Sequence, residues 1–307
     1  MSRDLKMRRA VGTHGTLHRI EDLQKRHDAK QTLPTLLCDS EGCSASVRFV
    51  PAHSRTPTGG VPMDVPAFIG LNKGAQHQPG CRYDAPARLQ SILTSGTDAA
   101  FLPALEDGKH ELRLLLLQQG LKRGAAVHAG EPSFDRYLAT LAELLSLRAL
   151  CADDALLTAR LTLRLGKKKV DWSSFFYEQD RYDDAWERLG SSSTELPMAL
   201  VGTVRSHRSP QPGAGAGTTY LNCAPKYQRT DVADRRDFYE VSVGHEDAAW
   251  LQSFPVGAEI VMFGLWRQGR TSTTSRPHPS DPRRSITSVT YKLALWPAFK
   301  QQLIEID

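Results

Sequence analysis

Five short stretches in the C-terminal third of the chain have residue patterns of β-strands. Apolar and polar residues alternate with a two-residue period in the third and fifth, and the fourth is nearly all apolar. A short helical segment, residues 246–253, follows the third stretch. In that third stretch, Tyr239, Val241 and Val243 are expected to face the core, which leaves Phe238 on the outer face. The predicted strands are Met198–Arg205, Thr218–Arg229, Phe238–Val243, Ala258–Trp266 and Ile286–Trp296.

Two long segments without hydrophobic periodicity interrupt these strands. His207–Gly217 joins the first and second strands, and Gln268–Ser285 joins the fourth and fifth. Both are rich in Arg, Gly, Ser and Pro, so the sequence predicts two mobile loops. The GAGAG run in the first loop is not a dinucleotide-binding motif, because no helix opens after it.

Five strands with a helix after the third and two long loops have the order of an OB-fold. The phrase FPVGAEIVMFG, residues 254–264, resembles the corner between the helix and the fourth strand in OB-fold nucleic-acid-binding proteins. The resemblance covers residues 197–296. It implies a five-stranded Greek-key barrel that binds a single-stranded oligonucleotide across strands two and three, between the two loops.

Arginines are concentrated on the two loops that would flank this ligand. A guanidinium group pairs with phosphate oxygens and stacks on bases, and aromatic side chains on strands two and three would also stack on bases. The alternative is that these arginines only keep loose loops soluble. The candidate nucleic-acid-binding residues are Arg205, Arg208, Tyr220, Tyr227, Arg229, Phe238, Arg267, Arg270, Arg276, Arg283, Arg284 and Lys292.

Candidate metal ligands form two close pairs in the N-terminal part. Cys38 and Cys43 make the first pair, His77 and Cys81 the second, and a glycine precedes the last cysteine of each. Two pairs on tight turns are typical of a structural zinc site, and three thiolates with one imidazole leave no coordination position for water. His53 is an alternative ligand to His77. The alternative to a metal site is three buried free cysteines.

Short strands are predicted between these pairs, at residues 47–50 and 67–71. The order of these elements resembles that of the zinc-ribbon-like N-terminal modules of competence-type DNA-processing proteins. It consists of a strand, a knuckle, a second strand and a closing H-x3-C. This resemblance covers residues 33–84 and rests on the four ligands. Those proteins often carry a nuclease domain after the ribbon, but its acidic and lysine pattern is absent from this sequence.

The remaining segments complete a multidomain α+β organisation. Residues 1–32 are predicted to be a basic arm with a helix near 16–28, which either docks on the next domain or follows phosphates. Residues 85–190 are predicted to be mainly helical, and their aromatic residues between 172 and 186 are expected to pack in a core. Residues 191–307 hold the predicted OB-fold.

In the middle region, helical spacing is evident in three segments, whereas the leucines of His110–Gln119 suit either a helix or a strand. The three helical segments are Pro86–Thr94, Phe134–Leu150 and Ala152–Leu161.

Composition adds limits to this organisation. Of the 307 residues, 40% are hydrophobic and 24% charged, as in globular and not disordered proteins. The formal charge of +5 permits an anionic partner. No stretch approaches the ~18–20 apolar residues of a membrane helix, and the N-terminus lacks the apolar region of a secretory signal. A cytoplasmic protein without membrane association is therefore expected.

The sequence as a whole predicts a non-enzymatic protein that binds single-stranded nucleic acid, DNA more than RNA, and holds structural zinc. Replication, recombination, repair or mobile-element transfer would use such a protein. The alternatives are an adaptor with protein partners and a metal-dependent nuclease, although the common hydrolase, nucleotide-binding and deaminase motifs are absent. Homo-oligomer formation stays open.

Overall fold

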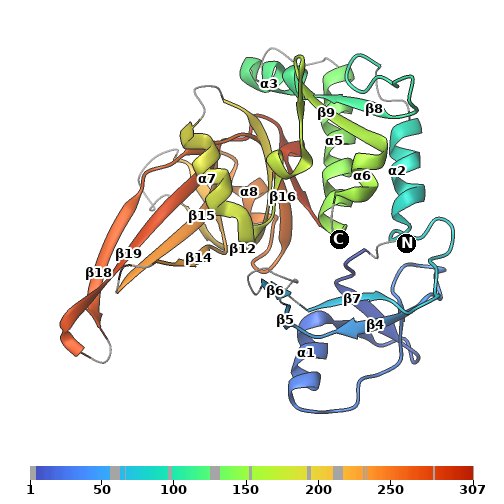
Figure 1. Ribbon diagram of the computed structural model, residues 1–307, viewed down its shortest axis with the longest axis horizontal. Helices are drawn as coiled ribbons and strands as arrows, with labels where there is room; N and C mark the ends of the chain where they lie inside the picture. The colour runs from blue at the N-terminus through green and yellow to red at the C-terminus, as the bar shows by residue number, and fades with distance from the viewer. Residues whose placement is uncertain are drawn as a thin grey trace. The chain divides into compact units, whose positions relative to one another are not determined.

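The computed structural model describes residues 5–55, 63–65, 67–95, 99–124, 132–151, 154–191, 195–209, 217–230, 232, 234–278 and 281–306. The chain divides into two compact units (Figure 1). Unit 1 contains Met1–Ser95 and Leu150–Leu157, and unit 2 contains Gly96–Ala149 and Thr158–Asp307. None of the described helices is both long and apolar enough to cross a membrane.

Unit 1 is built around an antiparallel sheet with the strand order β2-β1-β3-β4-β7. The alternation in β4 shows why it forms, because Val47 and Phe49 are buried and Arg48 between them is exposed. The strands are β1 Arg9–Gly12, β2 Leu17–Arg19, β3 Leu36–Cys38, β4 Ser46–Val50 and β7 Phe68–Leu71, with the separate hairpin β5 His53–Arg55 and β6 Met63–Val65. The helices are α1 Ile20–Asp28 and α2 Ala85–Thr94.

The N-terminal segment is part of this sheet. Strand β1 pairs with β2 on one side and with β3, which carries Cys38, on the other. Helix α1 packs through Leu23, whose side chain is fully buried. The predicted boundary at residue 32 therefore falls between two strands of one sheet, and residues 9–28 are not a separate basic arm.

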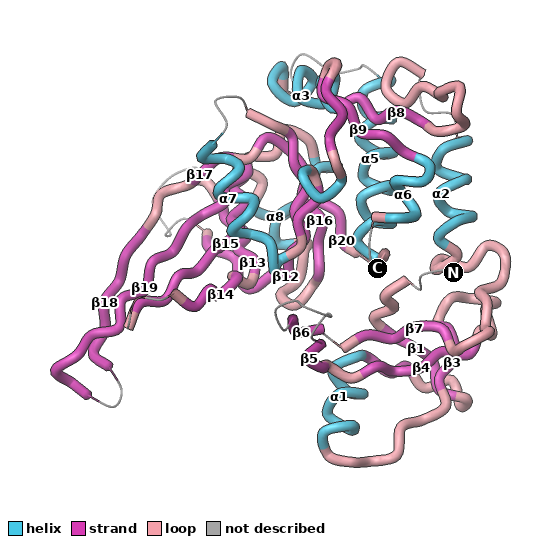
Figure 2. The backbone as a smooth tube through the Cα atoms, viewed as in Figure 1, coloured by secondary structure: helices cyan, strands magenta, loops and turns pink. Residues whose placement is uncertain are grey.

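Unit 2 begins with helices around a small sheet of order β10-β9-β8 (Figure 2). The ambiguous segment at His110 contains a strand followed by a helix. Leu112 is buried in the strand, and Leu114, Leu117 and Leu121 line one face of the helix. The elements are β8 His110–Arg113, α3 Leu114–Arg123, α5 Pro132–Leu150, α6 Ala155–Arg160, β9 Leu161–Leu165, β10 Lys168–Val170, β11 Phe176–Tyr177 and α7 Tyr182–Ser191, with short 3-10 turns at Trp172–Ser174, Gln179–Arg181 and Lys300–Gln302.

The dense aromatic segment after β10 is buried, as predicted. Phe175 and Tyr182 are fully buried, and Tyr182 donates a hydrogen bond of 2.7 Å to the carbonyl of Val201. Strand β11 pairs in parallel with β12. These aromatics thus join the helical part of unit 2 to the C-terminal sheet.

The C-terminal part is a curled half-barrel sheet. Its strand order is β17-β19-β15-β13-β12-β16-β20, with β14 beside β15 and β18 beside β19. Strands β15 and β19 run parallel. The elements are β12 Pro197–Arg208, β13 Thr219–Cys223, β14 Lys226–Arg229, β15 Arg235–His245, α8 Ala248–Gln252, β16 Glu259–Leu265, β17 Arg267–Gln268, β18 Ser272–His278, β19 Asp281–Leu295 and β20 Leu303–Glu305.

The core of this sheet follows the predicted alternation. Tyr239, Val241 and Val243 of β15 are buried together with Leu221 and Leu293 from the neighbouring strands. The predicted second strand is divided into β13 and β14 at residues 224–225. Pro225 has no backbone N–H to donate to a ladder, which explains the break.

The segment predicted as a mobile loop between strands four and five is instead an ordered hairpin. Strand β18 pairs with the first half of β19, and Figure 1 shows this arm extending past the end of β14. Both faces of β18 are polar and exposed, so no hydrophobic period marks it in the sequence. The prediction of a loop at Gln268–Ser285 was therefore wrong. Most of the other predicted loop, residues 210–216, lies outside the described residues.

Candidate functional site

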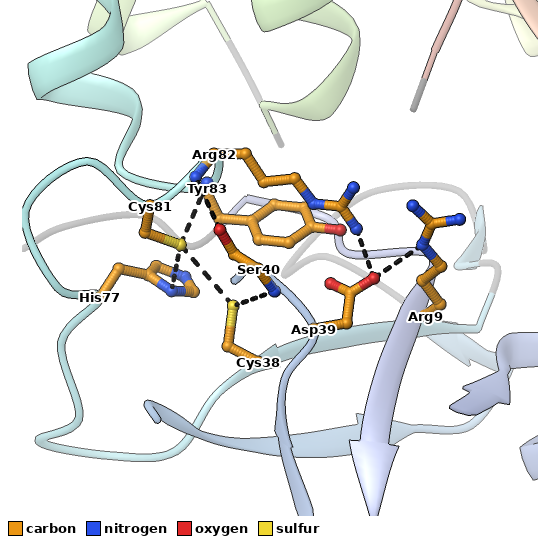
Figure 3. Close-up of polar contacts among 8 residues, drawn as sticks. All are labelled: Arg9, Cys38, Asp39, Ser40, His77, Cys81, Arg82 and Tyr83. Atoms are coloured by element: carbon orange, nitrogen blue, oxygen red, sulfur yellow. Dashed lines mark hydrogen bonds and ion pairs between the residues drawn. The ribbon is translucent and has the colours of Figure 1, made fainter. Parts of the chain in front are cut away.

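Three cysteines and one histidine converge in unit 1, and Figure 3 draws Cys38, His77 and Cys81. The Sγ atoms of Cys38 and Cys81 are 3.6 Å apart. His77 Nδ1 lies 3.4 Å from Cys81 Sγ and 3.7 Å from Cys43 Sγ. All four ligand atoms lie within 4.8 Å of one another. In tetrahedral zinc sites, Zn–S bonds of about 2.3 Å place two sulfur atoms about 3.8 Å apart.

Two similar turns bring these ligands together. In Ser40–Cys43 and in Gln78–Cys81, the N–H of the cysteine donates to the carbonyl of the first turn residue at 3.0 Å. The glycine before each cysteine has a positive φ, +71° for Gly42 and +83° for Gly80. Positive φ at the third position is typical of type II turns, and glycine adopts it without steric cost.

The environment of the cluster acts differently on the pKa values of two of its thiols. Burial raises the pKa of the Cys38 thiol, although the backbone N–H of Ser40 opposes this shift. At Cys43, burial also acts to raise the pKa, but hydrogen bonds to backbone groups lower it on balance. A metal ion compensates the burial of thiolate charge. By donor type and spacing, Cys38, Cys43, His77 and Cys81 can hold a metal ion such as zinc.

His53 lies apart from the cluster. Its side chain is exposed, and its Nδ1 is 3.0 Å from the carbonyl oxygen of Pro51. The two cysteines outside the cluster, Cys151 and Cys223, are buried elsewhere. His77 is therefore the histidine that the fold brings to the three thiols.

A buried carboxylate connects the two turns beside the cluster (Figure 3). Asp39, with 2% of its side chain exposed, accepts a 2.7 Å hydrogen bond from Arg9 and pairs with Arg82. Arg82 also covers the ring of Tyr83 at 4.8 Å. Because Asp39 follows Cys38 and Arg82 follows Cys81, this ion pair holds the two ligand pairs together from outside the ligand shell.

The outer face of the curled sheet, in unit 2, gathers many of the predicted nucleic-acid-binding residues. We define this face by the alternate residues of β15 from Arg236 to Gly244 and their in-register neighbours, since cross-strand neighbours share a face. Tyr227 lies opposite Phe238, and Arg229 lies opposite Arg236. On the other side of β15, Lys292 of β19 lies opposite Glu240.

At the far end of β15 the same face carries a second group. Tyr220 lies opposite Gly244, and Arg208 lies opposite Tyr220. The guanidinium carbon of Arg208 is 4.8 Å from the centroid of the Tyr220 ring. Arg267 lies opposite Ala294, which is itself in register with Ser242. Eight of the twelve predicted residues therefore lie on this face or next to it: Arg205, Arg208, Tyr220, Tyr227, Arg229, Phe238, Arg267 and Lys292.

Phe238 and Tyr227 form an aromatic pair at the near end of this face. Their ring centroids are 5.5 Å apart at an interplanar angle of 49°. Tyr227 is 52% exposed, and Phe238 is half-buried. The pair thus presents a partly exposed aromatic surface among polar neighbours.

Several predicted arginines are matched by carboxylates, which reduces their attraction for phosphate. These pairs are Arg205 with Glu240, Arg267 with Glu195 and Arg284 with Asp234. Among the residues that the structure describes, no carboxylate forms an ion pair with Arg208, Arg276 or Lys292. Arg270 and Arg283, the other two arginines of the segment predicted as a loop, are exposed. Arg270 lies just before β18, at the base of the β18–β19 hairpin, and Arg283 lies near the start of β19.

Comparisons with known proteins find a distant likeness among solved structures. No protein-family model matches the chain. No curated protein matches it either. Among solved structures, it is similar to the small single-stranded DNA-binding protein from Streptomyces coelicolor, with 18% sequence identity over 33% of this chain and 90% of that chain and a TM-score of 0.17.

Sequence reasoning missed two residues of the outer face. Arg236 precedes the predicted third strand, which was expected to begin at Phe238, but β15 begins at Arg235 and places Arg236 next to Phe238 on the outer face. Trp296, which is 53% exposed, was treated only as the end of the last strand. Continuing the alternation of β19 from Lys292 would have placed Trp296 on the same face.

Proposed function

We propose that this chain is a non-enzymatic cytoplasmic protein that binds single-stranded nucleic acid, DNA in preference to RNA, on the outer face of an OB-fold. The observation that carries the proposal is the aromatic pair Tyr227–Phe238 beside the arginines of the same face. Replication, recombination, repair or mobile-element transfer would use such an activity. The Cys38–Cys43–His77–Cys81 cluster would hold structural zinc.

The strand connectivity supports an OB-fold. Strand β12 pairs antiparallel with both β13 and β16, and β15 pairs with β13 and β19. Counted along the chain, the first strand thus lies between the second and the fourth, and the third lies between the second and the fifth. The segment Arg267–Gln268 follows β16 and pairs with β19, which brings the fourth strand to the fifth. In an OB-fold, the face of the second and third strands binds oligonucleotides.

The chemistry of the face supports a single-stranded ligand. Aromatic rings stack on any base that is not already stacked inside a duplex, and guanidinium groups contact phosphate and base faces. A double helix hides the faces of its bases, so Tyr227 and Phe238 would have nothing to stack on. The absence of an acidic pair on this face among the described residues, apart from carboxylates matched by arginines, favours binding over hydrolysis.

The metal cluster supports a structural role for zinc. Three thiolates and one imidazole complete a tetrahedral shell, which leaves no position for a catalytic water. All three cysteines are buried. Zinc would then stabilise unit 1 by joining two turns that are distant in sequence, and it would take no part in a reaction.

Fluorescence anisotropy tests the proposal. Labelled single-stranded DNA, single-stranded RNA and duplex DNA of equal length would be titrated with the full chain at two salt concentrations. We expect binding to the single strands, strongest for DNA, that weakens with salt, and about 5- to 100-fold weaker binding for Phe238→Ala. Val256→Ala, which removes an exposed side chain in a turn before β16, is the matched control. Failure of the chain to bind any single strand, or preference for duplex, would overturn the proposal.

A further inference from the structure

Trp296 is an exposed tryptophan at the end of the outer face. It follows directly after β19, which ends at Leu295, and 53% of its surface is exposed. Large exposed aromatics carry a free-energy penalty in water, and a tryptophan offers the largest stacking surface of any side chain. The exposed part of the ring is therefore available to a ligand.

Gly244 makes room for this ring. A Cβ atom at Gly244 would come within 2.9 Å of Trp296 Nε1 and 3.1 Å of Tyr220 Cε1. Both contacts are closer than real Cβ atoms usually tolerate, so glycine is what allows Trp296 and Tyr220 to approach β15 from its two sides. Arg208 covers the Tyr220 ring. Together, Tyr220, Trp296 and Arg208 form what we call the second aromatic group.

The second aromatic group and the Tyr227–Phe238 pair lie on the same face of the same strand. Phe238 and Gly244 are both on the outer face of β15, six residues apart, which corresponds to about 20 Å along a strand. Neither group reaches the other with its own side chains. A ligand that contacts both must therefore be extended along β15.

The residues between the two groups are polar, and the two that belong to β15, Glu240 and Ser242, are buried. Partly exposed polar side chains lie next to them and form the surface there: Arg205 pairs with Glu240, Lys292 lies opposite Glu240, and Asn222 accepts a 2.9 Å hydrogen bond from the Ser242 hydroxyl. An apolar peptide helix would need a continuous apolar stripe between its anchors, which this surface does not provide. A single strand of nucleic acid alternates apolar base faces with a charged backbone and fits two stacking surfaces joined by a polar track.

We propose that Trp296 and Tyr220 form a second base-stacking site, so that one single strand runs along β15 from the Tyr227–Phe238 pair to the second aromatic group. This inference rests on the proposed function and extends it: the ligand is a strand long enough to span both groups. Bases stack at each end, and the phosphates between them pass Lys292. Arg208 adds its charge at the Trp296 end.

Trp296→Ala and Trp296→Phe test this site with oligothymidylates of increasing length. The inference predicts about 5- to 100-fold weaker binding of Trp296→Ala to long oligomers and no change for oligomers too short to span both groups. Trp296→Phe keeps a stacking ring, so its affinity stays near that of the unmodified protein. Because Trp296 is exposed, its fluorescence should be quenched by long oligomers, and this component should be lost in Trp296→Phe.

The outcomes separate the two proposals. If the unmodified chain binds, Phe238→Ala weakens binding and Trp296→Ala binds long oligomers as tightly as the unmodified chain, the second stacking site is wrong and the proposed function stands. If Trp296→Ala loses affinity equally for short and long oligomers, the proposal that one strand spans both aromatic groups is also wrong. If the unmodified chain binds no single strand, the proposed function fails and the inference fails with it. Should Trp296→Ala not fold, the length-dependent quenching in the unmodified chain and its loss in Trp296→Phe decide the question.

Discussion

Tyr227 lies directly opposite Phe238 in the β14–β15 ladder, and the centroids of their rings are 5.5 Å apart. The two side chains come from segments that the sequence separates by a polar turn. Their contact makes one surface out of two rings, so they should act on a ligand as a unit. This relationship leads to the first of four predictions.

Tyr227→Ala and Phe238→Ala are expected to be non-additive. Each single change should weaken binding to single-stranded DNA, and the double variant should lose less than the product of the two fold-changes, because removing one ring disturbs the surface of the other. Anisotropy titrations of the four proteins with one oligonucleotide give the coupling. Independent effects, with fold-changes that multiply, would show that the rings do not form one binding surface.

The salt dependence should distinguish free cations from paired ones. Lys292→Gln and Arg208→Gln should each reduce the log–log slope of affinity against salt by about 0.7, the value for one phosphate contact on a single strand. Arg205 already pairs with Glu240, so Arg205→Gln serves as the control and should leave the slope nearly unchanged. An equal change for all three variants would contradict the distinction.

Metal content should follow the four residues of the cluster. The purified chain is expected to hold one zinc ion, and Cys81→Ser or His77→Ala should reduce that content sharply, because each removes a ligand from a closed shell. Chelation should lower the thermal midpoint of the unmodified chain, since metal that binds only the folded state stabilises it. Cys151→Ser, which changes a buried cysteine outside the cluster, and His53→Ala are the controls and should retain the metal. Full zinc retention in Cys81→Ser would exclude this ligand set.

The ion pairs of Asp39 should contribute to the stability of unit 1 independently of the metal. Asp39→Asn leaves Arg9 and Arg82 without their shared carboxylate and is expected to reduce the free energy of unfolding by about 1–3 kcal/mol. Chemical denaturation should show this loss both with added zinc and after chelation. Asp28→Asn, at an exposed carboxylate on α1, is the matched control. A loss seen only in the zinc-loaded protein would mean that Asp39 acts through the metal site alone.

Much of the local structure could be predicted from residue patterns. The alternation of Tyr239, Val241 and Val243 predicted that these side chains face the core, and all three belong to the hydrophobic core of the sheet. The spacing of the cysteines and the glycine before each closing cysteine indicated two turns that present ligands, and the four ligand atoms do converge. These features depend on short-range geometry, which the sequence records directly.

Other features depend on pairing between distant segments. Strand β18 has no hydrophobic face, so only its hydrogen bonds to β19 make it a strand, and the sequence indicated a loop. The N-terminal residues are basic and looked like an arm, but β1 lies between two strands of the sheet of unit 1. Ion pairs such as Arg205 with Glu240 could not be predicted from the sequence, because their partners lie on different strands. These pairs determine how much positive charge of the arginines remains available to a ligand.

The sequence by itself determined the candidate metal ligands, the buried face of each central strand and the choice of Phe238 as an outer aromatic, because each is set by spacing over a few residues. Tertiary structure alone decided that His77 and not His53 joins the cysteines. It also decided that Tyr227 lies against Phe238 and that Trp296 lies beside Gly244 at the other end of β15. Those contacts depend on strand register, and register is fixed by the packing of the whole sheet.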